Sequence, residues 1–140
     1  MRLVVDTDVI VAAIRSPTGA SAALLRYLDQ GLATILLSVP LALEYEAKCQ
    51  LPEHRLICQL STEEVDAFIN TLIAISEPVH IRFVWRPQVR DPNDEMVLET
   101  AVNGGADAIV TFNQRHFAEP SRRFGIPALL PREALKAVRT

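Results

Sequence analysis

Leu3-Val4-Val5-Asp6-Thr7-Asp8, near the start of the 140-residue chain, predicts both the fold and the position of a site. Three apolar residues, two of them β-branched, suit a short buried strand. The apolar stretch 9–14 that follows is long enough to begin a helix. A strand that ends on Asp and turns into a helix places that Asp at the carboxyl edge of a sheet, where open α/β sheets build their sites. We therefore expect Asp6 to be the first ligand of a divalent metal ion.

Strand and helix patterns alternate along the rest of the chain. Buried strands are expected at 33–37, 108–111 and 126–130, and an edge strand or extended segment, flanked by prolines, at 79–83. Helices are expected at 21–30, from Ser38 to about 50, and at 62–75, 91–103 and 131–138. This alternation predicts an α/β fold with a parallel sheet in a single domain over residues 1–140.

The composition is that of an ordinary globular protein. A net charge of −3 is unlike that of proteins that bind nucleic acid through backbone charge alone, yet it is compatible with a nuclease whose carboxylates bind cations. The chain shows neither a secretory signal nor an apolar run long enough to span a bilayer. Cys49 and Cys58 are too few for a disulfide framework and lack zinc-site spacing. We expect a cytoplasmic protein with reduced thiols and no membrane contact.

Three acidic residues are the candidates for chemistry: Asp6, Glu44 and Asp94. Glu44 lies in the middle of a predicted helix, and Asp94 lies in the first turn of another, on the same side as Leu98 and Ala101. Mg²⁺ and Mn²⁺ prefer oxygen ligands and need only a few carboxylates together with water. Clustered carboxylates repel one another without a metal ion, so a convergent cluster indicates a metal site that activates water for attack on a phosphate.

Each of these acids also has an ordinary structural interpretation. Asp6 could simply cap the helix that follows it. Glu44 could pair with Lys48 one helical turn further along the surface. Asp94 could interact only with the helix dipole, a role for which Glu95 competes. Spacing alone leaves these alternatives open.

The order of the motifs resembles that of PIN domains, and most of all the VapC-like toxins of bacterial toxin–antitoxin pairs. The resemblance covers nearly the whole chain and rests on segments 4–8, 38–44, 90–95, 105–111 with Asn113, and 131–135. It implies a three-layer α/β/α fold with a central parallel sheet. It also implies a ribonuclease that uses Mg²⁺ or Mn²⁺ held by Asp6, Glu44 and Asp94.

The chain departs from the family pattern near its acidic positions. Asn113 stands where the family usually has a fourth acid, and His116 stands where a second Asp is often found. Asp8 replaces the commoner Asn and could supply the extra charge. Thr7 and Thr111 are expected to hold the carboxylates by hydrogen bonds.

The resemblance also implies partners and contacts. The RNA substrate is expected to contact basic residues of the loops, for which the candidates are Arg15, Arg90, Arg115 and His116. A cognate antitoxin and a homodimer are expected as protein partners. Both would need exposed apolar surface, for which the candidates are the helices around 24–28 and 68–72.

Two other functions remain as alternatives. A degenerate PIN fold could bind RNA or a protein without catalysis, which the missing fourth acid favours. A phosphatase of the haloacid-dehalogenase type would use Asp6 as nucleophile and Asp8 as general acid. That enzyme also needs a Lys after a later strand, and none follows 109–111 closely.

Overall fold

Strands and helices alternate along the chain and form a parallel sheet covered by helices. The computed structural model describes residues 1–84 and 91–139. The elements in chain order are β1 (Arg2–Val5), α1 (Thr7–Arg15), α2 (Ala20–Asp29), β2 (Thr34–Leu37), α3 (Val39–Cys49), α4 (Pro52–Ile57), α5 (Thr62–Ile75), β3 (Glu77–Pro78), α6 (Pro92–Gly104), β4 (Ala108–Val110), the 3₁₀ helix η1 (Gln114–Phe117), α7 (Ala118–Phe124), β5 (Ala128–Leu129) and α8 (Pro131–Arg139).

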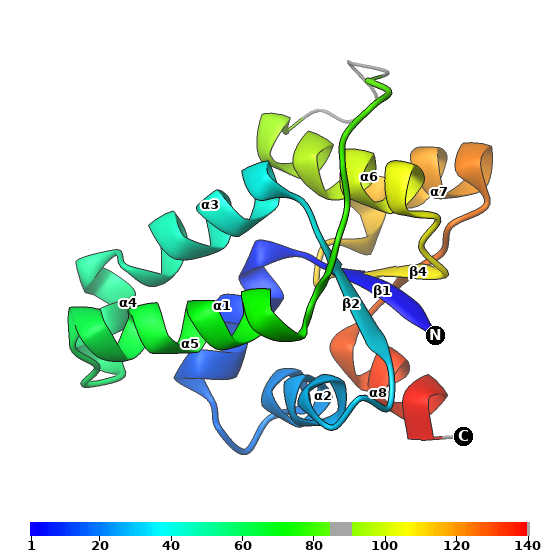
Figure 1. Ribbon diagram of the computed structural model, residues 1–140. Coiled ribbons are helices and arrows are strands. Elements are labelled where there is room, and N and C mark those ends of the chain that lie inside the picture. The colour runs from blue at the N-terminus through cyan, green and yellow to red at the C-terminus, as the bar shows by residue number, and fades with distance from the viewer. Residues whose placement is uncertain (85–90, 140) are drawn as a thin grey trace.

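The sheet has five parallel strands in the order β3-β2-β1-β4-β5. Strand β1 is central, with Leu3 beside Ile35 of β2 and beside Ala108 of β4. Figure 1 shows α6 and α7 on one side of the sheet and α1, α2 and α8 on the other. The expected three-layer α/β/α fold is therefore confirmed. Because all strands run the same way, their carboxyl ends lie at one edge.

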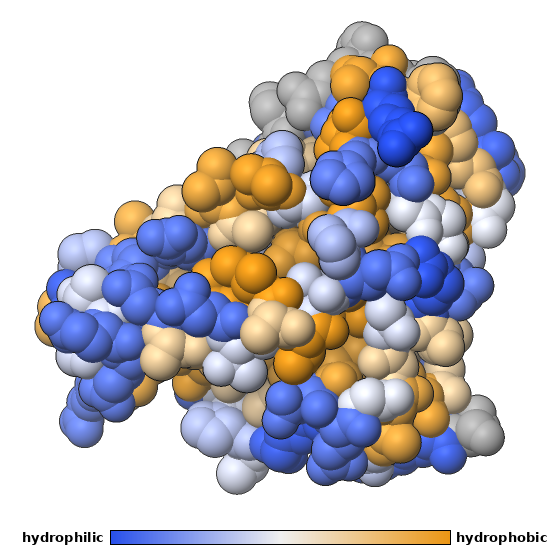
Figure 2. All heavy atoms as spheres, in the orientation of Figure 1, coloured by the Kyte–Doolittle hydropathy of each residue, from blue (hydrophilic) through white to orange (hydrophobic). Residues whose placement is uncertain are grey.

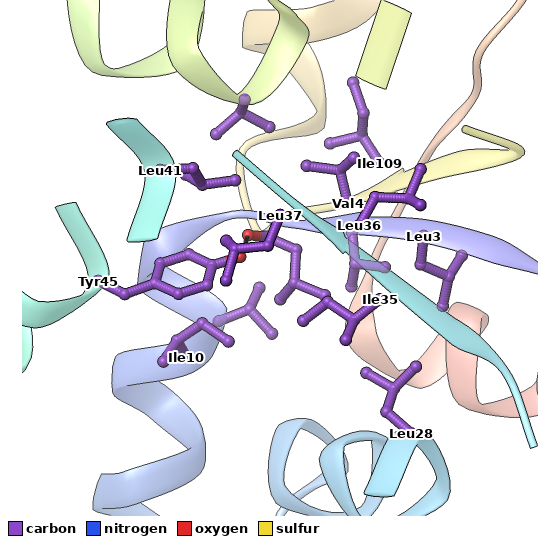
Figure 3. Packing of buried hydrophobic residues seen from close by; sticks show 14 of the residues in the cluster. Leu3, Val4, Ile10, Leu28, Ile35, Leu36, Leu37, Leu41, Tyr45 and Ile109 are labelled. Atoms are coloured by element: carbon purple, nitrogen blue, oxygen red, sulfur yellow. Dashed lines mark hydrogen bonds between the residues drawn. The ribbon is translucent and has the colours of Figure 1, made fainter. Parts of the chain in front are cut away.

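The core lies on both faces of the central strand. Leu3, Val4 and Val5 are fully buried, as expected for an apolar run in a parallel sheet. Figure 3 shows their neighbours Ile109 and Leu36 between the helix layers. This burial fixes the register of β1 and hence the position of the carboxylate that follows it.

Two helices begin where their capping residues predict. The Ser38 side chain accepts a hydrogen bond from the backbone N–H of Leu41 at the start of α3. Ser61 and Glu64 form a complete capping box at the start of α5. Helix α5 then spans Thr62–Ile75, the range that the sequence predicts.

The edge strand is shorter than predicted and lies earlier in the chain. Strand β3 is Glu77–Pro78, and its last contact with β2 is the hydrogen bond from Val79 N to Leu37 O, at 2.9 Å. The expected strand at 79–83 is therefore wrong in its bounds, although its edge position is confirmed.

A side chain replaces the sheet as hydrogen-bond partner beyond Val79. The Asn103 Oδ1 atom accepts from the backbone N–H groups of Arg82 and Phe83, both at 2.9 Å, and its Nδ2 donates to Phe83 O. Residues 82 and 83 therefore satisfy their backbone groups on α6 and need no partner strand.

Three helical segments lie where no helix was expected. The break expected at 51–54 is limited to the start of that range, because Pro52 suits the first position of a new helix and α4 begins there. Helices η1 and α7 lie between the third and fourth buried strands, where the sequence shows no strong apolar period. Helix η1 begins directly after Asn113 and contains His116, and α7 follows it without a break.

The apolar surface needed for partners differs from the prediction. The candidate side chains on α2 and α5 are buried in the core: Leu24, Leu25, Leu28 and Leu72. They therefore do not form the exposed surface that was expected. Large apolar residues are exposed instead on α3, where Val39 is 72% exposed. Figure 2 shows a hydrophobic patch over this helix.

Neither a membrane span nor a disulfide is found in the described residues. No single helix there is long and apolar enough to cross a membrane, although α1 and α2, bent by 102°, meet the length and composition test as a pair. Cys49 and Cys58 are free, and burial raises the pKa of the Cys49 thiol to about 12. Cys49 is therefore an inert core residue.

Gly104 is expected to tolerate no side chain. A Cβ atom at this position would lie 2.8 Å from Val79 Cγ2 and 3.0 Å from Leu36 Cδ1. We expect Gly104→Ala to lower the free energy of unfolding by about 1–3 kcal/mol, the usual cost of overpacking. Urea unfolding measures this change. The double variant with Val79→Ala should lose less than the two single changes summed, because it removes the nearest clash; strict additivity would contradict this account.

Candidate metal centre

Asp6 lies directly after β1 and is buried, with 6% of its surface exposed. Its Oδ2 atom accepts a hydrogen bond from Thr111 Oγ1 at 2.8 Å, and the backbone N–H of Thr7 donates to the same carboxylate. Apart from this bond at Thr7, the first residue of α1, the Asp6 side chain makes no capping hydrogen bond to the helix. Because Thr111 follows β4 at the same edge of the sheet, the Asp6 side chain is oriented toward this edge rather than used to cap the helix.

Asp94 reaches the same edge from the first turn of α6. It is 6% exposed, and Leu98 and Ala101 on the same helix face are buried, as the sequence predicts. Its Oδ2 atom lies 3.0 Å from Nδ1 of His116, a residue of η1. Asp94 is therefore a buried carboxylate with one neighbouring imidazole.

The two carboxylates lie within electrostatic range of each other. Burial raises the pKa of Asp6 to about 6, the Thr111 hydrogen bond opposes this shift, and the negative charges of Asp8 and Asp94 add to it. Burial also raises the pKa of Asp94, with the His116 hydrogen bond opposing and Asp8 adding to the shift. The structure therefore places Asp6 and Asp94, both buried, within reach of each other's negative charge and of the charge of the exposed Asp8.

Glu44 lies on α3, far from the other acids in the chain, and makes no hydrogen bond to Asp6, Asp8 or Asp94. It is half-buried on α3 and forms no ion pair with Lys48, so the surface-pair interpretation is not supported. Its neighbour Tyr45 is fully buried and donates a hydrogen bond to the Val5 carbonyl. In residues 1–84 and 91–139, no three His, Cys, Asp or Glu side chains form a group that could hold a metal ion.

The residues that depart from the family pattern line the same edge. The backbone N–H of Asn113 donates to Thr111 Oγ1 at 2.9 Å, and its Nδ2 lies 3.5 Å from Asp8 Oδ2. Asn113 therefore supports the Thr111 hydroxyl that orients Asp6. His116 contacts Asp94 directly, so it belongs to the acidic site, and its contact with RNA stays a prediction.

The predicted arginine contacts fall in different places. Arg15 is the last residue of α1, about 14 Å along the helix axis from Asp6, and its Nη1 lies 3.4 Å from His54 Nδ1. Arg115 is exposed on η1, beside His116. Arg90 lies outside the described residues. Arg15 is therefore remote from the acids, and Arg115 is near them.

The donor set fits a small hard cation. Asp6 and Asp94 offer carboxylate oxygens at one edge of the sheet, and Asp8 adds a third acid that is exposed. Mg²⁺ commonly uses one or two carboxylates together with water, so a group of three ready protein ligands is not required. Burial raises the pKa of Asp6 and of Asp94, so a cation bound between them would stabilise their charged forms.

Tyr45 is a residue of this region that sequence reasoning missed. Its hydroxyl holds the carbonyl of Val5, one residue before Asp6, and Figure 3 shows the ring directed from α3 to the end of β1. The i, i+4 spacing of Leu41, Tyr45 and Cys49 marks the buried face of α3. That spacing predicts the ring's burial, whereas the hydrogen bond depends on tertiary structure.

The comparisons with known proteins agree with this fold. A family model described as PIN domain matches residues 2–115. Among curated proteins, none matches the sequence significantly. The fold is similar to that of a chain in the crystal structure of VapBC2 from Rickettsia felis bound to a DNA fragment from their promoter, with 15% sequence identity and a TM-score of 0.59, covering 91% of this chain and 97% of that chain.

This protein belongs to the PIN domain family. Members of this family are generally nucleases that use divalent metal ions. Membership therefore removes the haloacid-dehalogenase alternative, in which Asp6 would be a phosphorylated nucleophile.

Proposed function

We propose that this protein is a metal-dependent endoribonuclease, the toxin of a toxin–antitoxin pair. The observation that carries the proposal is the approach of Asp6 and Asp94, two buried carboxylates from distant parts of the chain, to one edge of the sheet. Buried like charges destabilise a fold unless a cation compensates them. Membership of the PIN domain family supports a nuclease of this kind.

The proposed roles follow from the contacts of each side chain. Asp6 and Asp94 would hold one Mg²⁺ or Mn²⁺, and Asp8 would add negative charge beside them. Such an ion, when bound, orients a phosphate and lowers the pKa of water. Thr111 keeps the Asp6 carboxylate in one orientation. Glu44 would contact the site through water or accept the proton of the attacking water molecule.

Cleavage of RNA should depend on a divalent cation. We expect a fluorescent single-stranded RNA to be cut with Mn²⁺ or Mg²⁺ and to stay intact with EDTA, because two carboxylates alone supply no positive charge to a phosphate. Gel analysis of the products measures this, and excess Mn²⁺ should restore activity after chelation. Equal cleavage with and without EDTA would contradict the proposal.

A second candidate is a PIN fold that binds RNA or a protein without catalysis. Two observations favour it. Asn113 brings no charge to the site, and His116 Nδ1 contacts Oδ2 of Asp94, an oxygen that a metal ion would otherwise use. Calorimetric titration with Mn²⁺ separates the two functions. Absence of binding at millimolar metal would favour the non-catalytic module, and saturable binding that Asp6→Asn removes would favour the nuclease.

Partners form part of the same proposal. The similar chain comes from a complex named VapBC2, so we infer that an antitoxin binds this protein as well. We also infer a homodimer, for which the exposed apolar residues Val39 and Leu43 of α3 offer a surface. Light scattering of the purified chain, with Leu43→Glu as the comparison, tests the dimer.

A further inference from the structure

A pocket of about 390 Å³ opens between the second half of α1 and the start of α8. Its lining includes Ala12, Ser16, Phe112, Leu130 and Arg132. None of these residues is part of the acid cluster. The volume lies within the range of sites that hold a small molecule or one unit of a polymer.

The pocket adjoins the acids because its walls follow the same strand ends. The side chain of Thr111 donates to Asp6, and its backbone N–H donates to Leu129 O at 2.8 Å. Phe112 follows Thr111 in the chain, and Leu130 follows Leu129. On the other wall, Ala12 lies six residues after Asp6, about 9 Å along the axis of α1.

Hydrogen bonds hold the wall formed by β5 and α8. The Glu133 Oε1 atom accepts from the backbone N–H of Leu130 at 2.8 Å and from Gln114 Nε2 at 2.9 Å. The same Gln114 amide donates to Ala128 O at 2.9 Å. Ala128 of β5 and Leu130 directly after it are thus linked to η1, so this side of the pocket is formed before any ligand arrives.

The pocket presents a flat apolar group and a cation. Phe112 is 48% exposed although Thr111, its neighbour, is fully buried. Arg132, at the start of α8, also lines the pocket and is exposed. Proteins that bind single-stranded nucleic acid stack bases on exposed aromatic rings and hold the backbone with arginine or lysine. Figure 1 shows the pocket's two boundaries, α1 and α8, on the same side of the sheet.

We propose that this pocket binds one base of a single-stranded RNA, stacked on Phe112, while Arg132 contacts the adjoining phosphate. The proposal rests on the proposed nuclease function, since it places the bound strand beside Asp6 and Asp94. It goes further by assigning a site that selects unpaired RNA, because a base inside a duplex cannot reach a ring in a pocket.

Binding measured without metal tests the pocket separately from cleavage. Fluorescence anisotropy with a labelled single-stranded RNA in EDTA should give a Kd that Phe112→Ala weakens by roughly tenfold. Phe112→Trp should keep the affinity. The matched control is Phe83→Ala: this ring is also exposed, but it follows β3 at the other edge of the sheet.

Two further variants address the walls. Ala12→Leu keeps a strong helix former and fills the pocket, so it should weaken RNA binding as well. Arg132→Ala should lower the slope of log Kd against log salt by about one, because one phosphate contact is lost. Arg82→Ala is the control for lost positive charge, because Arg82 is exposed and follows β3 at the other edge of the sheet.

The outcomes separate this inference from the proposed function. RNA binding that depends on Phe112, in a protein that never cleaves RNA with Mn²⁺, would support the pocket and contradict the nuclease. Metal-dependent cleavage with unchanged Kd and KM in Phe112→Ala and Ala12→Leu would overturn the pocket and leave the nuclease standing. Equal affinity for single-stranded and duplex RNA would also overturn it.

Discussion

Asp6→Asn and Asp94→Asn should each reduce Mn²⁺-dependent RNA cleavage on the order of a thousandfold. The amide keeps the shape of the side chain and removes its charge, so the ion loses a ligand that contributes several kcal/mol to the transition state. Single-turnover cleavage of RNA measures the loss. Asp29→Asn, an exposed acid at the end of α2, is the matched control and should cleave as the wild type does.

Glu44 is tested in the same assay with its own control. Glu44→Gln should lower kcat if this side chain accepts a proton or orders a water molecule. Glu46→Gln changes an exposed acid on the same helix and should have no effect. Full activity of Asp6→Asn or Asp94→Asn would remove the basis of the nuclease proposal. Full activity of Glu44→Gln would remove only Glu44 from it.

Without metal, Asp6→Asn should be more stable than the wild type at neutral pH. The pKa of Asp6 rises from 3.8 to about 6 on folding, so the folded state binds the proton more tightly than the unfolded state does. The contribution of Asp6 to stability is therefore fully present below pH 3.8 and is lost as pH rises through about 6. Roughly two pKa units correspond to about 3 kcal/mol.

Urea unfolding in EDTA at several pH values measures this difference. The advantage of Asp6→Asn should be largest at about pH 7.5 and shrink toward pH 4. Added Mn²⁺ should stabilise the wild type more than the variant, because binding to the folded state alone raises its stability. A variant whose advantage is constant with pH, or larger in acid, would contradict the assigned cause.

The fold could be predicted where local and global preferences agree. The apolar run 3–5, the Ser38 cap and the Ser61 capping box all give elements at the expected places. The prediction failed at 79–83, because a tertiary hydrogen-bond partner, Asn103, replaces the sheet there. Alternating apolar residues indicate an extended chain but do not specify which group its backbone will bind.

The position of Asp6 in the candidate site could be predicted from the sequence, because this residue directly follows a buried strand. The positions of the other candidate residues could be predicted less well. Asp6 and Asp94 meet at one edge because parallel topology and a helix N-terminus dictate it. The position of Glu44 depends on how α3 lies against the sheet, which no periodicity encodes. The contact of His116 with Asp94 depends on η1, a 3₁₀ turn that has no strong sequence signal.

The position of β1 in the middle of the sheet has a consequence during synthesis. The strand leaves the ribosome well before β4, one of its two neighbours, and the Asp6–Thr111 hydrogen bond spans 105 residues. A nascent chain that stops before this point has no partner on that side of β1 and no hydroxyl to orient Asp6. Prematurely terminated products therefore lack the assembled acid cluster, and under the proposed function unfinished copies of the chain would be inactive.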